Sequence, residues 1–295
     1  MTSDSYEVKQ LATALFLIDK LALRVGNEKK TTEAETVGVT TLKIKNVTIL
    51  PNDTIKLDFL GKDSIRYVNK FKVPSIVHNN INDFITYKNK SNNDDLFDVI
   101  TSDSLNKYIK RFMKKLTSKV FRTYNASYLM QIELTKISKK YSDYNKPDKV
   151  QKLIHEYEMA NLKVAKLCNH QKEVSKTSST QLEKTDTKIK ELKSTLNKLQ
   201  RDKAKKIEKG NNTTSVNKRI ASVQDKIKNL KNKKSRQTES KSLSTGTSKI
   251  NYIDPRITIS FLKTNNMLDN IDKFFNKNHQ KQFSWAMEIN GDYRF

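Results

Sequence analysis

Apolar residues near the N-terminus recur at the spacing of one helix face. The row covers 8–25, and Ser3 and Asp4 before it are candidate N-caps. We therefore expect a first helix that ends close to Gly26. This helix would carry Arg24 at its C-terminal edge.

Three short runs with strand-like patterning follow this helix. They cover 36–42, 46–50 and the alternating Ile55, Leu57 and Phe59. A turn at Gly61-Lys62-Asp63 separates the last run from 64–73, so these two segments are expected to form a β-hairpin. Lys62 would lie at its tip.

Helical patterns dominate the rest of the chain. The expected helices cover 102–116, about 120–141 and 147–169, and apolar faces continue over 257–261 and 271–289. His170 follows the helix over 147–169 at its C-terminal end. Asp254-Pro255-Arg256 is expected to stop or open an element. The chain is therefore predicted to be mainly α, in an α+β arrangement with one small antiparallel β region.

The insert over 171–240 carries two rows of apolar residues at heptad spacing. They are Ile189, Leu192, Leu196 and Leu199, then Val216, Ile220, Val223, Ile227 and Leu230. Such spacing is typical of the a and d positions of a coiled coil. The segment Gly210–Thr214 between the rows has the residues of a helix stop and turn, so we expect an antiparallel coiled-coil hairpin. The alternative is a solvated, partly disordered basic spacer.

The composition adds a partner to this picture. The 295 residues carry a formal net charge of +25, and 171–240 alone holds 20 Lys and Arg against 8 Asp and Glu. Such a surplus favours a polyanion, of which nucleic acid is the commonest, with an anionic membrane surface as the rival. No apolar stretch is long enough for a membrane span, and signal-peptide features are absent, so neither spanning nor secretion is supported. The single cysteine, Cys168, suits a reducing compartment.

Five side chains form a candidate set for cleaving a phosphodiester: Arg24, Lys62, Arg122, His170 and Tyr252. Each also has an ordinary structural interpretation. Arg24 could merely complement a helix dipole, Lys62 is one of many lysines, and Tyr252 is one of eleven tyrosines. One cysteine and scattered histidines do not predict a zinc site. Because the sequence also lacks a P-loop and a carboxylate cluster for Mg²⁺, we expect no cofactor and no metal.

The segments that carry these side chains resemble eukaryotic type IB DNA topoisomerase I. They are Phe16–Arg24, Asp58–Tyr67, Lys119–Ser127, Leu167–Gln171 and Gly246–Arg256, in the family's order and with a coiled-coil linker at the family's position. The resemblance implies the helical catalytic core that tyrosine recombinases and type IB topoisomerases share. It divides the chain into a catalytic core over 1–173, a basic coiled-coil linker over 174–241 and a short helical C-terminal domain over 242–295.

The resemblance also implies an activity and its residues. The family relaxes supercoiled double-stranded DNA without ATP, by cutting one strand, letting it rotate and resealing it. Arg24, Lys62, Arg122, His170 and Tyr252 match its catalytic residues. The expected DNA contacts are Lys62, Asp63, Lys249 and Asn251. We further expect a monomer in the nucleus, as the family implies.

The chemistry of these residue types supports the match. A tyrosine has a pKa of about 10 in water, so it needs cationic surroundings to attack phosphorus at neutral pH. Arg24 and Arg122 can donate paired hydrogen bonds to the non-bridging oxygens, and His170 can donate to one of them. Lys62 can protonate the departing 5′ oxygen as a general acid. The 3′-phosphotyrosine preserves the phosphodiester's energy, so the 5′ hydroxyl can reseal the strand.

Two other functions stay open at this point. A tyrosine recombinase or integrase would share the fold, but it typically carries His-x-x-Arg where this chain has Lys119-Val120-Phe121-Arg122. A non-catalytic DNA-binding module would use the same basic surface. The family's cap lobe, which precedes the helix that begins near Tyr6, has no counterpart here. We therefore expect a fragment or a separate polypeptide that supplies the cap lobe, and weak DNA binding by this chain alone.

Overall fold

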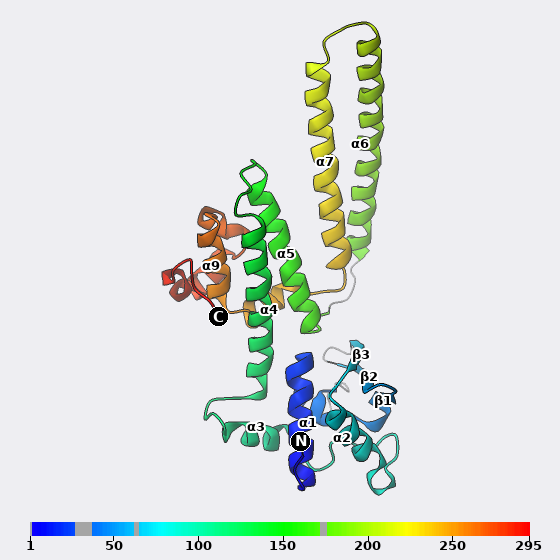
Figure 1. The fold of residues 1–295 in the computed structure, drawn as a ribbon, viewed down its shortest axis with the longest axis vertical. Helices are drawn as coiled ribbons and strands as arrows, with labels where there is room; N and C mark the ends of the chain where they lie inside the picture. Colours follow the sequence, from blue (N-terminus) through cyan, green and yellow to red (C-terminus); the bar gives the residue numbers. More distant parts are fainter. Residues whose placement is uncertain (1, 27–36, 62–64, 172–175) are drawn as a thin grey trace.

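Buried apolar side chains form two separate cores. The structure is a computed structural model, and it describes residues 2–26, 37–61, 65–171 and 176–295. The first core lies within residues 11–109 and the second within 126–286. Helix α4 (Ser118–Lys140) runs from the first core into the second (Figure 1). The fold is mainly helical, as predicted.

The first core packs three helices around a small sheet. The helices are α1 (Tyr6–Leu21), α2 (Ser75–Thr86) and α3 (Ser102–Lys110). The strands β1 (Val47–Leu50), β2 (Thr54–Leu60) and β3 (Arg66–Lys72) form an antiparallel sheet in the order β1-β2-β3. Leu57 pairs with Val47 on one side and with Asn69 on the other. The predicted hairpin is therefore confirmed. Lys62, which was expected at its tip, lies outside the described residues.

The second core packs α4 against α5 (Lys149–Leu167) and the C-terminal helices. These are α8 (Thr245–Asn251), α9 (Pro255–Thr264) and α10 (Lys277–Gln282). The carboxylate of Asp254 accepts a hydrogen bond from the backbone N–H of Arg256, and Pro255 occupies the first turn of α9. Asp254-Pro255 therefore opens a helix, because both residues suit a helix start.

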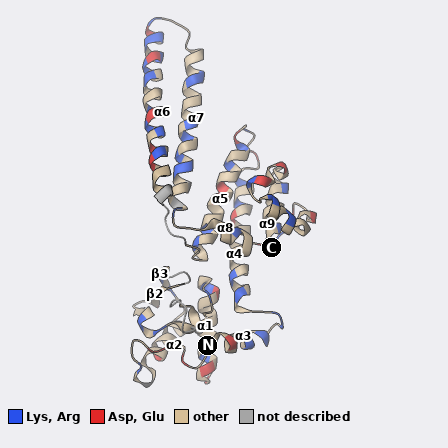
Figure 2. Ribbon diagram, turned by 180° about the vertical axis from the view of Figure 1, so that it is seen from behind, with Lys and Arg blue, Asp and Glu red and all other residues tan. Residues whose placement is uncertain are grey.

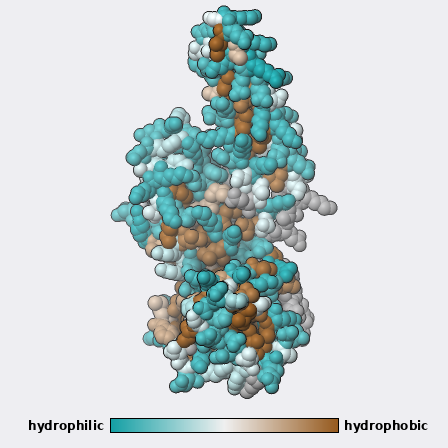
Figure 3. Space-filling view, turned by 45° about the vertical axis from the view of Figure 1, so that its right-hand side comes forward, coloured by the Kyte–Doolittle hydropathy of each residue, from teal (hydrophilic) through white to brown (hydrophobic). Residues whose placement is uncertain are grey.

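The predicted coiled coil is an antiparallel hairpin of α6 (Lys176–Glu208) and α7 (Thr214–Glu239), which extends away from both cores (Figure 1). Ile189, Leu199, Val216 and Ile227 of the two heptad rows are buried along its seam. Gly210 adopts φ 64°, which glycine reaches without strain, and ends α6. In the space-filling view the hairpin is mostly hydrophilic, with a narrow row of hydrophobic side chains (Figure 3). Among the described residues no helix is long and apolar enough to cross a membrane.

Three details differ from the sequence-based expectations. Helix α1 ends at Leu21, because Ala22 turns into the left-handed region at φ 49°, so Arg24 lies in the following loop and not at the helix edge. The described part of the expected strand over 36–42 contains a 3₁₀ helix, Val39–Thr41, and no strand. Helix α3 ends at Lys110, six residues before the predicted Leu116. Helices α2 and α8 were not predicted.

Candidate active site

Arg122 lies in the first turns of α4, where that helix passes between the two cores. Its side chain is 4% exposed, and Nη2 donates a hydrogen bond to the carbonyl of Cys168, 2.9 Å away. Within the described residues, Nε and Nη1 have no hydrogen-bond partner although both are buried. Burial lowers the pKa of Arg122, and the nearby Arg24 lowers it further. The guanidinium therefore keeps two buried donors for a group that the described residues do not supply.

The loop after α1 brings Arg24 to the same place. The N–H of Val39 donates to the carbonyl of Arg24 (2.9 Å), and that of Thr40 donates to Val25 (2.7 Å). Gly26 adopts φ 91°, and a Cβ on Gly38 would come within 2.2 Å of the Gly26 backbone. Only glycines allow this close approach. The exposed Arg24 side chain is thus carried on a loop whose backbone is fixed.

His170 follows α5 through Asn169, whose φ of 50° ends the helix. The imidazole is 6% exposed, and its Nδ1 lies 3.0 Å from Oγ of Ser248. Nε2 is buried and has no partner among the described residues. Burial, followed by the charges of Arg122 and Arg24, lowers the pKa of His170 to about 4. His170 is therefore a neutral imidazole at neutral pH.

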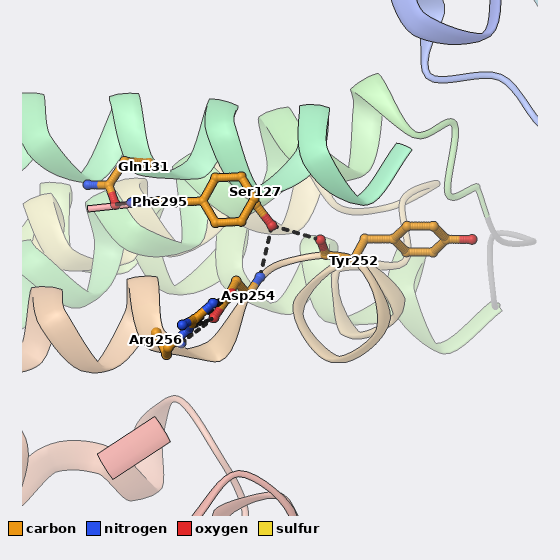
Figure 4. A network of polar contacts seen from close by, with 6 residues as sticks. All are labelled: Ser127, Gln131, Tyr252, Asp254, Arg256 and Phe295. Atoms are coloured by element: carbon orange, nitrogen blue, oxygen red, sulfur yellow. Dashed lines mark hydrogen bonds and ion pairs between the residues drawn. The ribbon is translucent and has the colours of Figure 1, made fainter. Parts of the chain in front are cut away.

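Tyr252 follows α8, and its backbone is tied to α4. The hydroxyl of Ser127 donates to the Tyr252 carbonyl (3.1 Å) and accepts from the N–H of Asp254 (2.9 Å). Figure 4 shows the phenol on the side of its backbone away from Asp254 and Arg256. The ring centroid lies 4.8 Å from that of His170 and 5.0 Å from Cζ of Arg122. The Tyr252 hydroxyl has no hydrogen bond within the described part of the chain, so no internal contact has to break before it can act as a nucleophile.

A cavity of about 280 Å³ joins Arg24, Arg122 and His170, and the Tyr252 ring packs beside the last two. Its lining also includes Gly61, which follows β2. Buried polar atoms without partners are rare in native proteins, so these nitrogens are candidates for binding a ligand. Here Nε and Nη1 of Arg122 and Nε2 of His170 are all nitrogens that an anion can satisfy. The described residues contain no group of three or more His, Cys, Asp or Glu side chains that could hold a metal ion.

Two models of known protein families match this chain. The model described as "Eukaryotic DNA topoisomerase I, catalytic core" matches residues 1–203, and the model described as "C-terminal topoisomerase domain" matches residues 224–295. The chain belongs to the eukaryotic DNA topoisomerase I family. The resemblance drawn from the five sequence segments is thereby confirmed.

Curated members of the family match along almost the whole chain. "DNA topoisomerase 1 beta" of Arabidopsis thaliana is 43% identical over 97% of this chain and 32% of its own length. "DNA topoisomerase 1" of Homo sapiens is 39% identical over 99% and 39%, and "DNA topoisomerase I, mitochondrial" of Rattus norvegicus is 36% identical over 98% and 50%. The chain thus spans about a third of the length of the two Arabidopsis relatives.

The four predicted DNA-contact residues differ in whether the structure describes them and in how exposed they are. Lys62 and Asp63 lie outside the described residues, but Gly61, which precedes them, lines the cavity. Asn251 is exposed beside Tyr252. The ammonium of Lys249 donates instead to the carbonyl of Phe274, 2.5 Å away, and burial lowers its pKa. A DNA contact by Lys249 would require this internal bond to break.

Sequence reasoning missed two residues of the site. Ser127 and Ser248 lie within the segments Lys119–Ser127 and Gly246–Arg256 that carry the family resemblance, but neither was assigned a role. Both are almost fully buried, at 2% and 0% exposed. The Ser127 hydroxyl bonds the Tyr252 carbonyl, and the Ser248 hydroxyl bonds Nδ1 of His170. Serine is too common for a sequence signal to single them out without the fold.

Proposed function

We propose that this chain is the catalytic portion of a type IB DNA topoisomerase. It would relax supercoiled double-stranded DNA by cutting one strand through a 3′-phosphotyrosyl intermediate at Tyr252, followed by rotation and religation. The observation that carries the proposal is that Arg122 and His170 hold buried nitrogens, without partners among the described residues, beside the Tyr252 ring. Family membership supports DNA as the substrate.

The site geometry supports a division of labour. When Tyr252 attacks phosphorus, charge grows on the non-bridging oxygens, and Nε and Nη1 of Arg122 are already fixed and free to donate to them. Arg24 adds a second guanidinium to the lining of the same cavity. Neutral His170 can donate from Nε2 without gaining a charge. Lys62 is the proposed general acid for the departing 5′ oxygen, and the position of Gly61 at the cavity supports this assignment.

The wider assignments belong to the same proposal. Residues 1–173 form a catalytic core, 174–241 a linker and 242–295 a C-terminal domain that carries Tyr252. The chain acts as a monomer in the nucleus, and a separate polypeptide can supply the family's cap lobe. Strand cleavage requires neither ATP nor a divalent metal.

A plasmid assay tests the proposal. Supercoiled plasmid is incubated with the chain in EDTA without ATP, and covalent complexes are trapped with detergent. We expect relaxed plasmid and a protein–DNA adduct from the wild type and neither from Tyr252→Phe. Tyr128→Phe is the matched control, because Tyr128 is 48% exposed on α4 and does not line the cavity.

Each alternative function predicts a different result. Relaxation that persists in Tyr252→Phe would contradict the assignment of the nucleophile. Exchange of strands between paired sites would favour a tyrosine recombinase. DNA binding by the wild type without any adduct would favour a non-catalytic binding module.

A further inference from the structure

Ser248 is the only side chain within the described residues that hydrogen-bonds the imidazole of His170. Its Oγ lies 3.0 Å from Nδ1, and the serine is completely buried on α8. Among the described groups, the hydroxyl has no other hydrogen-bond partner. Its single hydrogen bond therefore has one of two directions, from serine to imidazole or from imidazole to serine.

The two directions leave His170 with different chemistry. A neutral imidazole has one N–H donor and one acceptor nitrogen. If Ser248 donates to Nδ1, then Nε2 carries the hydrogen and is a donor. If Nδ1 donates to Ser248, then Nε2 is an acceptor, and it would present a lone pair to a phosphate oxygen that is itself an acceptor.

We propose that Ser248 is a positioning residue that fixes the tautomer of His170, by donating to Nδ1 so that Nε2–H faces the scissile phosphate. This inference rests on the proposed function and deepens it. It explains why Nε2 is buried without a partner in the described structure. It also explains how an imidazole that packs beside Arg122 can serve an anion without adding a positive charge.

A hydroxyl suits this position better than a carboxylate. A carboxylate only accepts hydrogen bonds, so Nδ1 would have to donate to it, and Nε2 could donate as well only if the ring were charged. An imidazolium here would be buried and would face Arg122 and Arg24, and the pKa of His170 is already lowered by these influences. Ser248 allows the neutral ring to act as a donor.

Ser248 also connects His170 to the nucleophile. Its carbonyl accepts hydrogen bonds from the N–H groups of Tyr252 (3.1 Å) and Ile253 (3.0 Å). The carbonyl of His170 accepts from the N–H of Ser244 at the start of α8 (2.6 Å). One turn of helix thus fixes the imidazole through a side chain and the tyrosine through the backbone.

Cleavage kinetics test the proposal. A duplex oligonucleotide whose cut strand ends just beyond the cut site traps the adduct, because the short released piece, which carries the 5′ hydroxyl, dissociates before it can reseal the strand. We expect Ser248→Ala to slow adduct formation roughly 10-fold, the value of one hydrogen bond in the transition state, with unchanged duplex affinity. Ser248→Thr keeps the hydroxyl and should restore the rate. Ser260→Ala, a buried serine of α9 that bonds Gly291 outside the site, should cleave at the wild-type rate.

A tautomer measurement separates positioning from mere packing. In Tyr252→Phe bound to the duplex, ¹⁵N NMR should find the His170 hydrogen on Nε2, and the further exchange Ser248→Ala should shift the population towards Nδ1–H. His170→Gln assigns the signal among the four histidines. An Nδ1–H tautomer with Ser248 present, or a wild-type rate in Ser248→Ala, would overturn the role of Ser248. Absence of any wild-type adduct would instead contradict the proposed function, and the tautomer would still be readable.

Discussion

The α6–α7 hairpin and the cavity at the core junction are both rich in positive charge, but they hold it in opposite ways. Lys and Arg lie along both helices of the hairpin (Figure 2), and most of them are exposed to water. At the cavity, the guanidinium of Arg122 is buried and two of its nitrogens lack partners within the described residues. The number of cations is therefore a poor guide to chemistry, whereas their burial is a good one.

This difference has an energetic basis. An exposed ammonium is solvated, and its interaction with a phosphate is screened by salt. A buried guanidinium has already lost its water, so a phosphate oxygen that reaches it completes bonds that the protein leaves open. The hairpin should therefore contribute to DNA affinity and the cavity to the rate of strand cleavage.

The largest effect should come from Arg122→Lys. The ammonium keeps the charge but cannot present two fixed donors in one plane, so adduct formation should fall roughly 10²–10³-fold. Duplex affinity at moderate salt should change little. Single-turnover cleavage and fluorescence anisotropy measure the two quantities.

The control for this substitution is Arg111→Lys, because Arg111 is exposed at the end of α3 and lies outside the cavity. It should cleave at the wild-type rate. If Arg122→Lys retained more than about a tenth of the wild-type rate, the paired donors would not be the important feature of the cavity. Thermal melting checks that the variant is folded.

Substitutions in the hairpin should weaken DNA affinity and leave the cleavage rate unchanged, which is the opposite of the result expected for Arg122→Lys. Lys190→Gln combined with Lys226→Gln removes one exposed charge from each of its helices. If both lysines contact phosphates, the slope of log affinity against log salt should become shallower by about 1.8, and affinity should fall several-fold at low salt. The cleavage rate at saturating DNA should not change.

Lys277→Gln combined with Lys281→Gln is the charge-matched control on α10. An equal loss of affinity in this control would mean that DNA responds to net charge and not to the hairpin. A slower cleavage step in the hairpin variant would mean that the hairpin contributes to the rate of cleavage as well as to DNA affinity.

The parts of the fold that the sequence predicted are those with strong periodicity. The two heptad rows predicted α6 and α7, and alternation around Gly61 predicted the β2–β3 hairpin. The expected strand over 36–42 failed because backbone hydrogen bonds to Arg24 and Val25 favour a 3₁₀ turn there. Apolar β-branched residues in a short run do not distinguish these two outcomes.

The candidate site was predicted less from pattern than from matched segments. Arg24, Arg122, His170 and Tyr252 come together as those segments suggested, although the catalytic roles of these residues remain proposals. Arg24 lies in a loop because Ala22 has a left-handed backbone conformation, which alanine rarely adopts. The hydroxyls of Ser127 and Ser248 form hydrogen bonds with residues more than 70 positions away in the sequence. Local sequence carries no record of such contacts.

Acid should weaken the cavity through His170. Its pKa is about 4 when folded, against an ordinary value of 6.5, so between these pH values the unfolded chain binds more protons. Stability should therefore be lost as pH falls through this window. Arg122 from α4, Arg24 from the loop after α1 and the Tyr252 ring after α8 face the imidazole.

Melting temperatures at about pH 7 and about pH 5 measure this loss. His170→Gln has no imidazole to protonate, so its melting temperature should fall less than that of the wild type between these conditions. The carboxylates that also titrate there are common to both proteins and cancel in the difference. Equal losses in the two proteins would mean that protonated His170 is tolerated beside the arginines.

The smallest effect should come from an ion pair on the hairpin surface. Nζ of Lys234 lies 2.6 Å from Oδ1 of Asp186, but these side chains are 41% and 43% exposed. Such pairs contribute less than about 1 kcal/mol because water and salt screen them. Asp186→Asn should thus leave amide hydrogen exchange in α7 nearly unchanged, whereas Ile227→Ala, in the buried seam, should accelerate it strongly. Faster exchange in Asp186→Asn than in Ile227→Ala would mean that exposed charge, and not the apolar seam, stabilises the hairpin.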